Sequence, residues 1–201
     1  MEEIVVPLKI NVVGNAGVGK TSIIERFVNN KIHDQNVNSI FCALNMKQIV
    51  YNKKEIKVVL WDVGRQAQNY DLIFRNTQIC LVVFDPHDPK SFEDVNTWIE
   101  TVRQTTANGV IYVVVCNKID LANPLITHEM AQNLCNSEKE VTLKMCSAKT
   151  GEGVNELFDF VIGNICEDDE LFEHLYQQQL EYQQNAQPRD LTKDYSVCRI
   201  L

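Results

Sequence analysis

The chain reads Gly14-Asn15-Ala16-Gly17-Val18-Gly19-Lys20-Thr21 directly after an apolar run, Leu8–Val13, and before a helical pattern that begins at Ser22. The stretch matches G-x-x-x-x-G-K-[ST], which between a strand and a helix is a phosphate-binding loop. Its glycines turn backbone N–H groups toward phosphate oxygens, Lys20 is expected to reach the β- and γ-phosphates, and the Thr21 hydroxyl is expected to bind Mg²⁺. Alone, the motif indicates a nucleoside triphosphate and suits a GTPase, an ATPase or a kinase equally well.

Apolar runs of strand length alternate with amphipathic stretches along the rest of the chain. Besides Leu8–Val13, the runs are Ile56–Trp61, Ile79–Phe84, Val110–Cys116 and the weaker Val141–Cys146. Helical spacing covers Ser91–Thr105 and Val154–Ile165, and Ile40–Val50 followed by the polar Tyr51–Lys54 predicts an antiparallel edge strand with a hairpin. The sequence therefore predicts an α/β fold: the three-layer sandwich of P-loop nucleoside triphosphatases, with a mostly parallel six-stranded sheet and about five helices.

Composition limits the class of protein. With 201 residues, of which 45% are hydrophobic and 23% charged, the chain fits one globular domain, and we expect a monomer. A net charge of −8 argues against nucleic acid as a partner, because binding phosphates needs clustered Lys and Arg. Seven cysteines without C-x-x-C or zinc-ligand spacing indicate reduced thiols in the cytoplasm, and the sequence contains neither a secretion signal nor a membrane-spanning run.

The composition changes near Ile165, where an acidic run, residues 167–170, leads into a glutamine-rich stretch. We therefore expect a nucleotide-binding domain over residues 1–165 and an acidic, Gln-rich tail over residues 166–201. Composition favours a mobile linker at the start of this tail. Leu171, Leu175 and Tyr176 leave open that the last helix continues.

A second motif, Asn117-Lys118-Ile119-Asp120, follows the Val110–Cys116 run, at the edge where doubly wound sheets bind ligands. In this N-K-x-D pattern the Asp120 carboxylate can accept hydrogen bonds from N1–H and the exocyclic amine of guanine, whereas adenine offers a lone pair at N1. Ser147-Ala148-Lys149 follows the last strand and adds a backbone N–H for the guanine O6, with Lys149 packed nearby. The two motifs predict GTP and GDP rather than ATP, which sets a P-loop kinase aside.

With these motifs the chain resembles the Ras-superfamily small GTPases, most closely the Rab branch, from Leu8 to Ile165. Rab-like stretches are Lys57–Asp62, Leu81–Asp85 and Ser91–Val95 with Trp98. The resemblance implies a switch in vesicular membrane traffic that binds GTP and GDP with Mg²⁺, hydrolyses GTP slowly, and works with protein effectors, an exchange factor and a GTPase-activating protein. It implies Mg²⁺ contacts at Thr21, Ser39 and Asp62. The nucleotide contacts it implies are Asn15, Ala16, Gly17, Val18, Gly19, Lys20, Thr21, Ser22, Ser39, Gly64, Asn117, Lys118, Asp120, Ser147, Ala148 and Lys149.

The first switch departs from the Rab pattern. Ser39 falls where the family has its threonine and keeps a hydroxyl for Mg²⁺ and an amide for the γ-phosphate. An aromatic residue, a tyrosine and a glycine of the family are replaced by Ile32, Asn36 and Phe41. We therefore expect looser nucleotide capture.

The second switch departs further, because Asp62-Val63-Gly64-Arg65-Gln66 stands where the family reads D-T-A-G-Q. Without a gap, Gln66 orients the attacking water and acts with Lys20 and Ser39 in catalysis. With one residue deleted, Gly64 keeps the glycine slot and Arg65 replaces the glutamine. The segment is about three residues shorter than in typical Rabs, which favours a deletion, but both alignments stay open. We expect slow hydrolysis; the alternative is a non-catalytic GTP-binding interaction module.

The last four residues, Cys198-Arg199-Ile200-Leu201, fit C-a-a-X, where a terminal leucine favours geranylgeranylation of Cys198. From Cys166 onward the chain has eight acidic residues and three basic ones, so a polybasic second signal is missing. A single lipid chain gives only reversible attachment. The sequence therefore predicts a cytoplasmic protein that attaches reversibly to the cytosolic face of a membrane.

Overall fold

A computed structural model describes residues 4–31, 42–106, 109–138 and 141–185. Its sheet has the order β2-β3-β1-β4-β5-β6. β2 pairs antiparallel with β3 and forms one edge, and all other pairs are parallel. The strands are β1 Val6–Gly14, β2 Cys42–Tyr51, β3 Lys54–Val63, β4 Ile79–Phe84, β5 Ile111–Cys116 and β6 Val141–Met145. The predicted sheet, with its antiparallel edge strand and hairpin, is confirmed.

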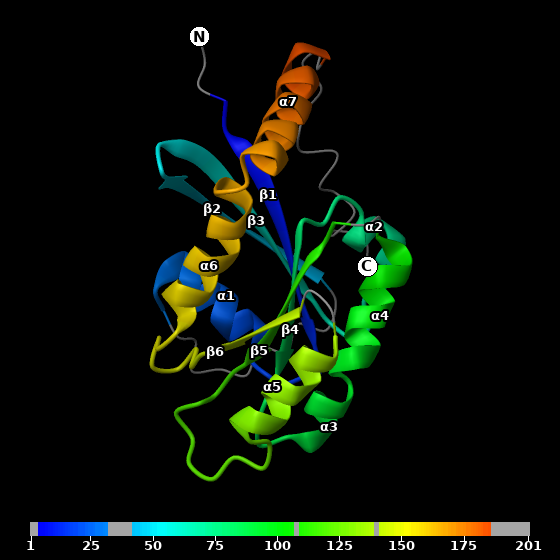
Figure 1. The fold of residues 1–201 in the computed structure, drawn as a ribbon, viewed down its shortest axis with the longest axis vertical. Coiled ribbons are helices and arrows are strands. Elements are labelled where there is room, and N and C mark those ends of the chain that lie inside the picture. Colours follow the sequence, from blue (N-terminus) through cyan, green and yellow to red (C-terminus); the bar gives the residue numbers. More distant parts are fainter. Residues whose placement is uncertain (1–3, 32–41, 107–108, 139–140, 186–201) are drawn as a thin grey trace.

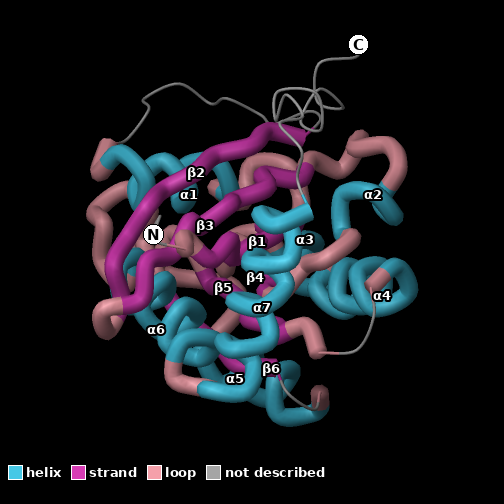
Figure 2. The backbone as a smooth tube through the Cα atoms, turned by 90° about the horizontal axis from the view of Figure 1, so that it is seen from above, coloured by secondary structure: helices cyan, strands magenta, loops and turns pink. Residues whose placement is uncertain are grey.

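Helices cover both faces of the sheet, and Figure 2 shows the strands as a twisted layer with α1 and α6 on one side and α2 and α4 on the other. Buried side chains of α1, α6 and α7 form one core with β1 and β3, and those of α2, α4 and α5 form a second core on the opposite face. The helices are α1 Lys20–Asn29, α2 Tyr70–Phe74, α3 Pro89–Glu93, α4 Val95–Thr105, α5 His128–Ser137, α6 Val154–Cys166 and α7 Asp169–Asn185. The predicted three-layer sandwich is confirmed, with more helices than expected because α2 and α3 are single short turns and α7 is added.

Burial explains why the central strands read as continuous apolar runs. Every residue of β4 is buried, as expected for a parallel strand covered on both faces, whereas β2 at the edge is half exposed. The parallel register aligns the strand ends, pairing Gly14 with Val83, Cys116 with Phe84, and Met145 with Cys116. The loops that follow β1, β3, β4, β5 and β6 therefore meet at one edge of the sheet.

The helix α7 corrects one expectation. Phe172 and Leu175 are buried in the same core as β1, and the Lys54 ammonium donates to the Cys166 carbonyl and lies 4.2 Å from the centre of the Phe172 ring. Figure 1 places α7 beside the start of β1, away from the carboxyl edge of the sheet. The interpretation as a mobile linker is wrong for residues 169–185, where the last helical pattern resumes after a short break. Among the residues described, no helix is long and apolar enough to span a bilayer.

A second correction concerns the helix expected over Ser91–Thr105. It begins earlier, at Pro89, and is divided at Asp94 into α3 and α4. The Asp88 side chain caps α3 by accepting from the Lys90 amide, with Pro89 in the first helical position. Asp94 lies at the junction of the two helices, over the phosphate-binding loop.

Candidate nucleotide-binding site

The predicted phosphate loop connects β1 to α1, and two of its glycines are required by close approach. Gly14 has φ +138°, and a Cβ there would lie 2.2 Å from the Val83 carbonyl oxygen. Gly19 has φ +99°, and a Cβ there would lie 2.2 Å from Nδ2 of Asn117. Because both contacts leave no room for a side chain, the loop can pack against β4 and the base-reading loop only with glycine at these positions.

Lys20 is the buried cation of this loop, only 6% exposed. Its ammonium donates to the carbonyl oxygens of Gly14 at 2.9 Å and Asn15 at 2.8 Å. Burial lowers the pKa of Lys20 below its ordinary value, and the nearby Asp62 carboxylate opposes that shift. Lys20 is thus a desolvated donor at the mouth of the loop, suited to exchange carbonyl oxygens for phosphate oxygens.

The predicted metal ligands Thr21 and Asp62 lie together. The Thr21 hydroxyl, in the first turn of α1, donates to Oδ2 of Asp62 at 2.5 Å, and Asp62 is fully buried near the end of β3. A hydroxyl and a carboxylate side by side are oxygen ligands of the kind that Mg²⁺ prefers, so this pair fits the ion. Ser39, the third predicted ligand, and the other first-switch positions lie outside the described residues, as does Cys198.

Asn117 joins three segments that are far apart in the sequence. Its Nδ2 donates to the Val18 carbonyl in the phosphate loop at 2.8 Å, and its Oδ1 accepts from the Ala148 amide at 3.0 Å. The side chain is almost completely buried. The structure thus brings together the three predicted motifs in one place.

Asp120, the predicted base-selecting carboxylate, is held by the Ser147-Ala148-Lys149 segment. The Ser147 hydroxyl donates to Oδ1 of Asp120 at 2.6 Å, and the Lys149 ammonium lies 3.9 Å from Oδ2. The hydroxyl of Ser147 also accepts from the Thr150 amide at 3.1 Å, which fixes its orientation. These contacts hold the Asp120 side chain in place, so that its oxygens can accept hydrogen bonds beside the loop.

Lys118 lies over the phosphate loop. Its ammonium donates to the Gly17 carbonyl at 2.8 Å and pairs with Asp85 at 2.6 Å. Although burial opposes the shift, the Lys118 ammonium and the His87 amide lower the pKa of the Asp85 carboxyl below its usual value. Asp85 therefore stays charged and holds Lys118 in position.

Sequence reasoning did not assign a role to two residues of this scaffold. Arg26 on α1 donates from Nε to the Ala148 carbonyl at 3.0 Å and from its Nη2 to the Lys149 carbonyl at 2.7 Å. Asp85, which anchors Lys118, follows the end of β4 directly. A charged residue at the carboxyl end of a buried strand was a signal for Asp85; no local pattern distinguishes Arg26 from other helix-surface arginines.

The remaining predicted residues fall into two groups. Ala16 and Gly17 form the exposed turn of the phosphate loop, and Ser22 lies in the first turn of α1. In the second switch, Gly64 is buried and its carbonyl accepts from the Ala67 amide, while Arg65 and Gln66 are exposed. The two alignments of this switch therefore both stay open.

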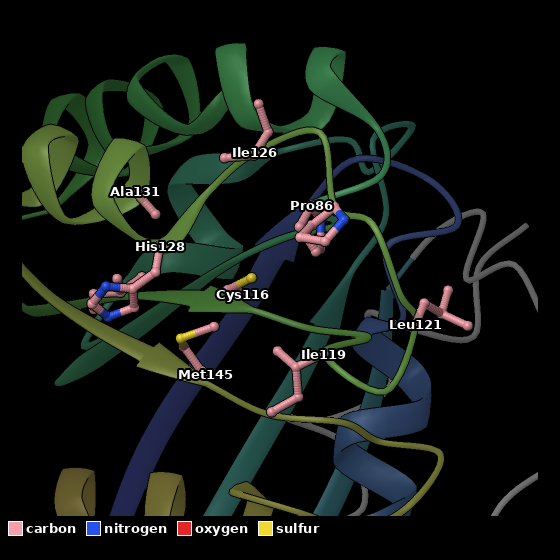
Figure 3. Close-up of a pocket in the computed structure, with 10 residues that line it drawn as sticks. Pro86, Cys116, Ile119, Leu121, Ile126, His128, Ala131 and Met145 are labelled. Atoms are coloured by element: carbon pink, nitrogen blue, oxygen red, sulfur yellow. The ribbon is translucent and has the colours of Figure 1, made fainter.

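An apolar cavity of about 210 Å³ adjoins the base-reading loop (Figure 3). Cys116 and Ile119, which flank Asn117 and Lys118 in the sequence, line it together with Met145, Ile126 and other residues. The ten lining residues include no acid, lysine or arginine. The cavity therefore lacks the lysine or arginine side chains that would neutralise a phosphate.

Comparison with known proteins gives consistent matches. Residues 9–167 match the model of the Ras family. The Ras-related protein RabC of Dictyostelium discoideum is 35% identical over 164 residues, covering 78% of this chain and 83% of its own length. The GTP-binding protein YPT53 of Saccharomyces cerevisiae is 32% identical over 161 residues, covering 75% of this chain and 73% of its own length. The Ras-related protein Rab7 of Drosophila melanogaster is 28% identical over 167 residues, covering 80% of this chain and 81% of its own length.

Proposed function

The chain belongs to the Ras family, and from this membership we propose that it is a Rab-like molecular switch regulating vesicular membrane traffic. As a member of that family it binds GTP and GDP with Mg²⁺ and hydrolyses GTP. The contacts of Asn117 with Val18 and Ala148 carry the proposal, because they bring the phosphate-binding and base-reading motifs into a single site.

We assign the roles of the site residues by their chemistry. The loop amides of residues 15–19 and Lys20 hold the phosphates, Asp120 and the Ala148 amide select guanine, and Thr21, Asp62 and Ser39 hold Mg²⁺. The bound Mg²⁺ supplies neutralisation of the phosphate charge. In one alignment of the second switch Gln66 would orient the attacking water, and in the other Arg65 would take the place of the glutamine. Because the family's D-T-A-G-Q pattern is altered in both, we expect slow hydrolysis.

The nucleotide content and single-turnover kinetics of the purified full chain test this proposal. We expect guanine nucleotide to co-purify, guanosine diphosphate to bind in strong preference to adenosine diphosphate, and phosphate release from GTP to be slow. Hydrolysis at the rate of an ordinary Rab contradicts only the expectation of slow hydrolysis and leaves the proposed nucleotide binding in place. GTP retained without any turnover supports a non-catalytic interaction module instead, and the absence of guanine binding overturns the proposal.

Membrane attachment is a separate part of the proposal. Geranylgeranylated Cys198 would supply one lipid chain, which gives reversible binding, so the protein is expected to cycle between the cytoplasm and a membrane face. Its other partners are expected to be effectors, an exchange factor and a GTPase-activating protein, each meeting it as a monomer. Replacing Cys198 with Ser should move the membrane fraction to the soluble fraction of a cell lysate; an unchanged distribution refutes the lipid anchor.

A further inference from the structure

Asp94, at the junction of α3 and α4, touches the phosphate loop although it lies far from it in the sequence. Its Oδ2 accepts from Nδ2 of Asn15 at 2.9 Å, and its Oδ1 lies 2.9 Å from the Lys90 ammonium. The residue is only 8% exposed. The hydrogen bonds from Lys90 and then from Asn15 hold the pKa of the Asp94 carboxyl below its usual value, so the group is a carboxylate at neutral pH.

A second residue, on α4, also binds the Asn15 side chain. The indole N–H of Trp98 on α4 donates to Oδ1 of Asn15 at 3.2 Å, so both ends of the amide are engaged. Asn15 is buried, whereas the next two loop residues, Ala16 and Gly17, are exposed. The amide therefore anchors the Asp94 carboxylate beside the phosphate loop.

The second switch supplies the third partner of Asp94. The Nη2 atom of Arg65 lies 3.5 Å from Oδ2 of Asp94, and the Arg65 side chain is 61% exposed. An exposed ion pair of this length is weak and can exchange its partner, whereas the buried bond from Asn15 is expected to persist. Arg65 is three residues after Asp62, the predicted Mg²⁺ ligand, and the Asp94 carboxylate connects it to Asn15 of the phosphate loop.

We propose that Asp94 is a specificity-determining residue that competes with the γ-phosphate for the Arg65 guanidinium and so sets the preference of the site between GTP and GDP. This inference rests on the proposed function, since it requires guanine nucleotide at the phosphate loop. With a diphosphate bound, Arg65 stays paired with Asp94. A bound γ-phosphate carries more negative charge than the Asp94 carboxylate and can accept two N–H groups of a guanidinium. We therefore expect Arg65 to leave Asp94 and to pair with the γ-phosphate.

Equilibrium binding in the presence of Mg²⁺ tests the competition, using GDP and a non-hydrolysable GTP analogue with the purified full chain. The measured quantity is the ratio of the two dissociation constants. Asp94→Asn is expected to shift this ratio toward the GTP analogue by about threefold to fivefold, the range of one exposed ion pair. In an Arg65→Ala background the same substitution should have little effect, because the competed group is absent.

Glu93→Gln is the matched control. Glu93 is the neighbouring carboxylate, also within 3.5 Å of the Lys90 ammonium, but it is exposed and no contact joins it to Asn15 or Arg65 among the described residues. We expect it to leave the ratio unchanged. Emission of Trp98, which becomes the single tryptophan in a Trp61→Phe parent, reports in each variant whether the indole contact with Asn15 is intact.

The outcomes separate the two proposals. If the parent protein binds no guanine nucleotide, the proposed function fails. If it binds normally but Asp94→Asn leaves the ratio unchanged, or shifts it equally with and without Arg65, the competition is overturned. Should Asp94→Asn not fold, Arg65→Ala decides alone: it is expected to lower the preference for the GTP analogue, and an unchanged ratio overturns the inference.

Discussion

The two ends of the nucleotide site are built from different bonds. At the base end a neutral amide, Asn117, fixes three segments through buried hydrogen bonds to the Val18 carbonyl and the Ala148 amide. At the phosphate end, charged side chains contact other groups of the protein: Lys20 contacts loop carbonyls, and Arg65 contacts Asp94. The neutral bonds of the base end join protein groups to one another, so we expect them to shape the site independently of nucleotide. The charged bonds of the phosphate end must be exchanged when phosphates bind.

The strongest test of this contrast is Lys20→Met. We expect nucleotide affinity to fall by at least about a hundredfold, since the lysine makes charge-assisted hydrogen bonds to phosphate that are each about twice as strong as neutral ones. Stability of the nucleotide-free protein should change little, because relief of the burial that disfavours the charged ammonium offsets the loss of its bonds to the Gly14 and Asn15 carbonyls. Isothermal titration with GDP and urea unfolding without nucleotide measure the two effects.

Lys118→Met is the paired variant for this experiment. Lys118 also donates to a loop carbonyl, but it is ion-paired with the buried Asp85. Its loss leaves a carboxylate without its partner, so we expect the nucleotide-free protein to lose stability. If Lys20→Met loses as much stability as Lys118→Met, the proposed difference between the two ends is wrong.

Asn117→Ala tests the base end and should have the next largest effect. Removing the amide leaves a buried carbonyl and a buried N–H without their partner, which costs about 1–3 kcal/mol per group. We therefore expect the free energy of unfolding without nucleotide to fall by about 2 kcal/mol or more, and GDP affinity to fall with it. Urea unfolding and GDP titration give both values.

Asn164→Ala is the control for that variant. Asn164 is exposed and makes a single local bond, to the Phe160 carbonyl one turn earlier in α6. Its replacement is expected to change stability by less than about 0.5 kcal/mol. Equal stability loss in Asn117→Ala and Asn164→Ala would show that the base end is not preformed by the Asn117 bonds.

The sheet and the motifs were predictable because their signals are local. Parallel strands covered on both faces read as continuous apolar runs, and the phosphate loop and base-reading motifs are contiguous in sequence. The α7 helix was only the less favoured alternative to a mobile linker, because its buried face depends on Phe172 and Leu175 among many glutamines, which a composition argument averages away. The break at Asp94 was also not predicted, because the apolar residues from Phe92 to Val102 keep helical spacing across it.

Long-range pairs explain what the sequence did not predict about the site. Asp94 meets Asn15 across 79 positions, and Arg26 reaches Ala148 across 122. No spacing rule connects residues at such separations, so these contacts become visible only when the sheet register brings the loops together. The alignment of Arg65 and Gln66 stays a prediction, because both side chains are exposed and their contacts do not depend on a motif.

Arg26→Met is the smallest and most selective test, since Arg26 supports the backbone of the base end with a charged side chain. Its guanidinium holds the carbonyls of Ala148 and Lys149, and its stem lies 3.6 Å from the position that a Cβ on Gly151 would take. Methionine keeps an apolar stem but loses the hydrogen bonds to the Ala148 and Lys149 carbonyls, so we expect GDP release to accelerate by about threefold, the scale of one partly exposed charged contact. Release of a fluorescent GDP analogue under excess unlabelled GDP measures this rate.

Arg103→Met, which removes ion pairs with Glu100 and Glu138, should leave the release rate unchanged. If Arg26→Met accelerates release as strongly as Asn117→Ala, charge shapes the base end as well, and the contrast between the two ends disappears.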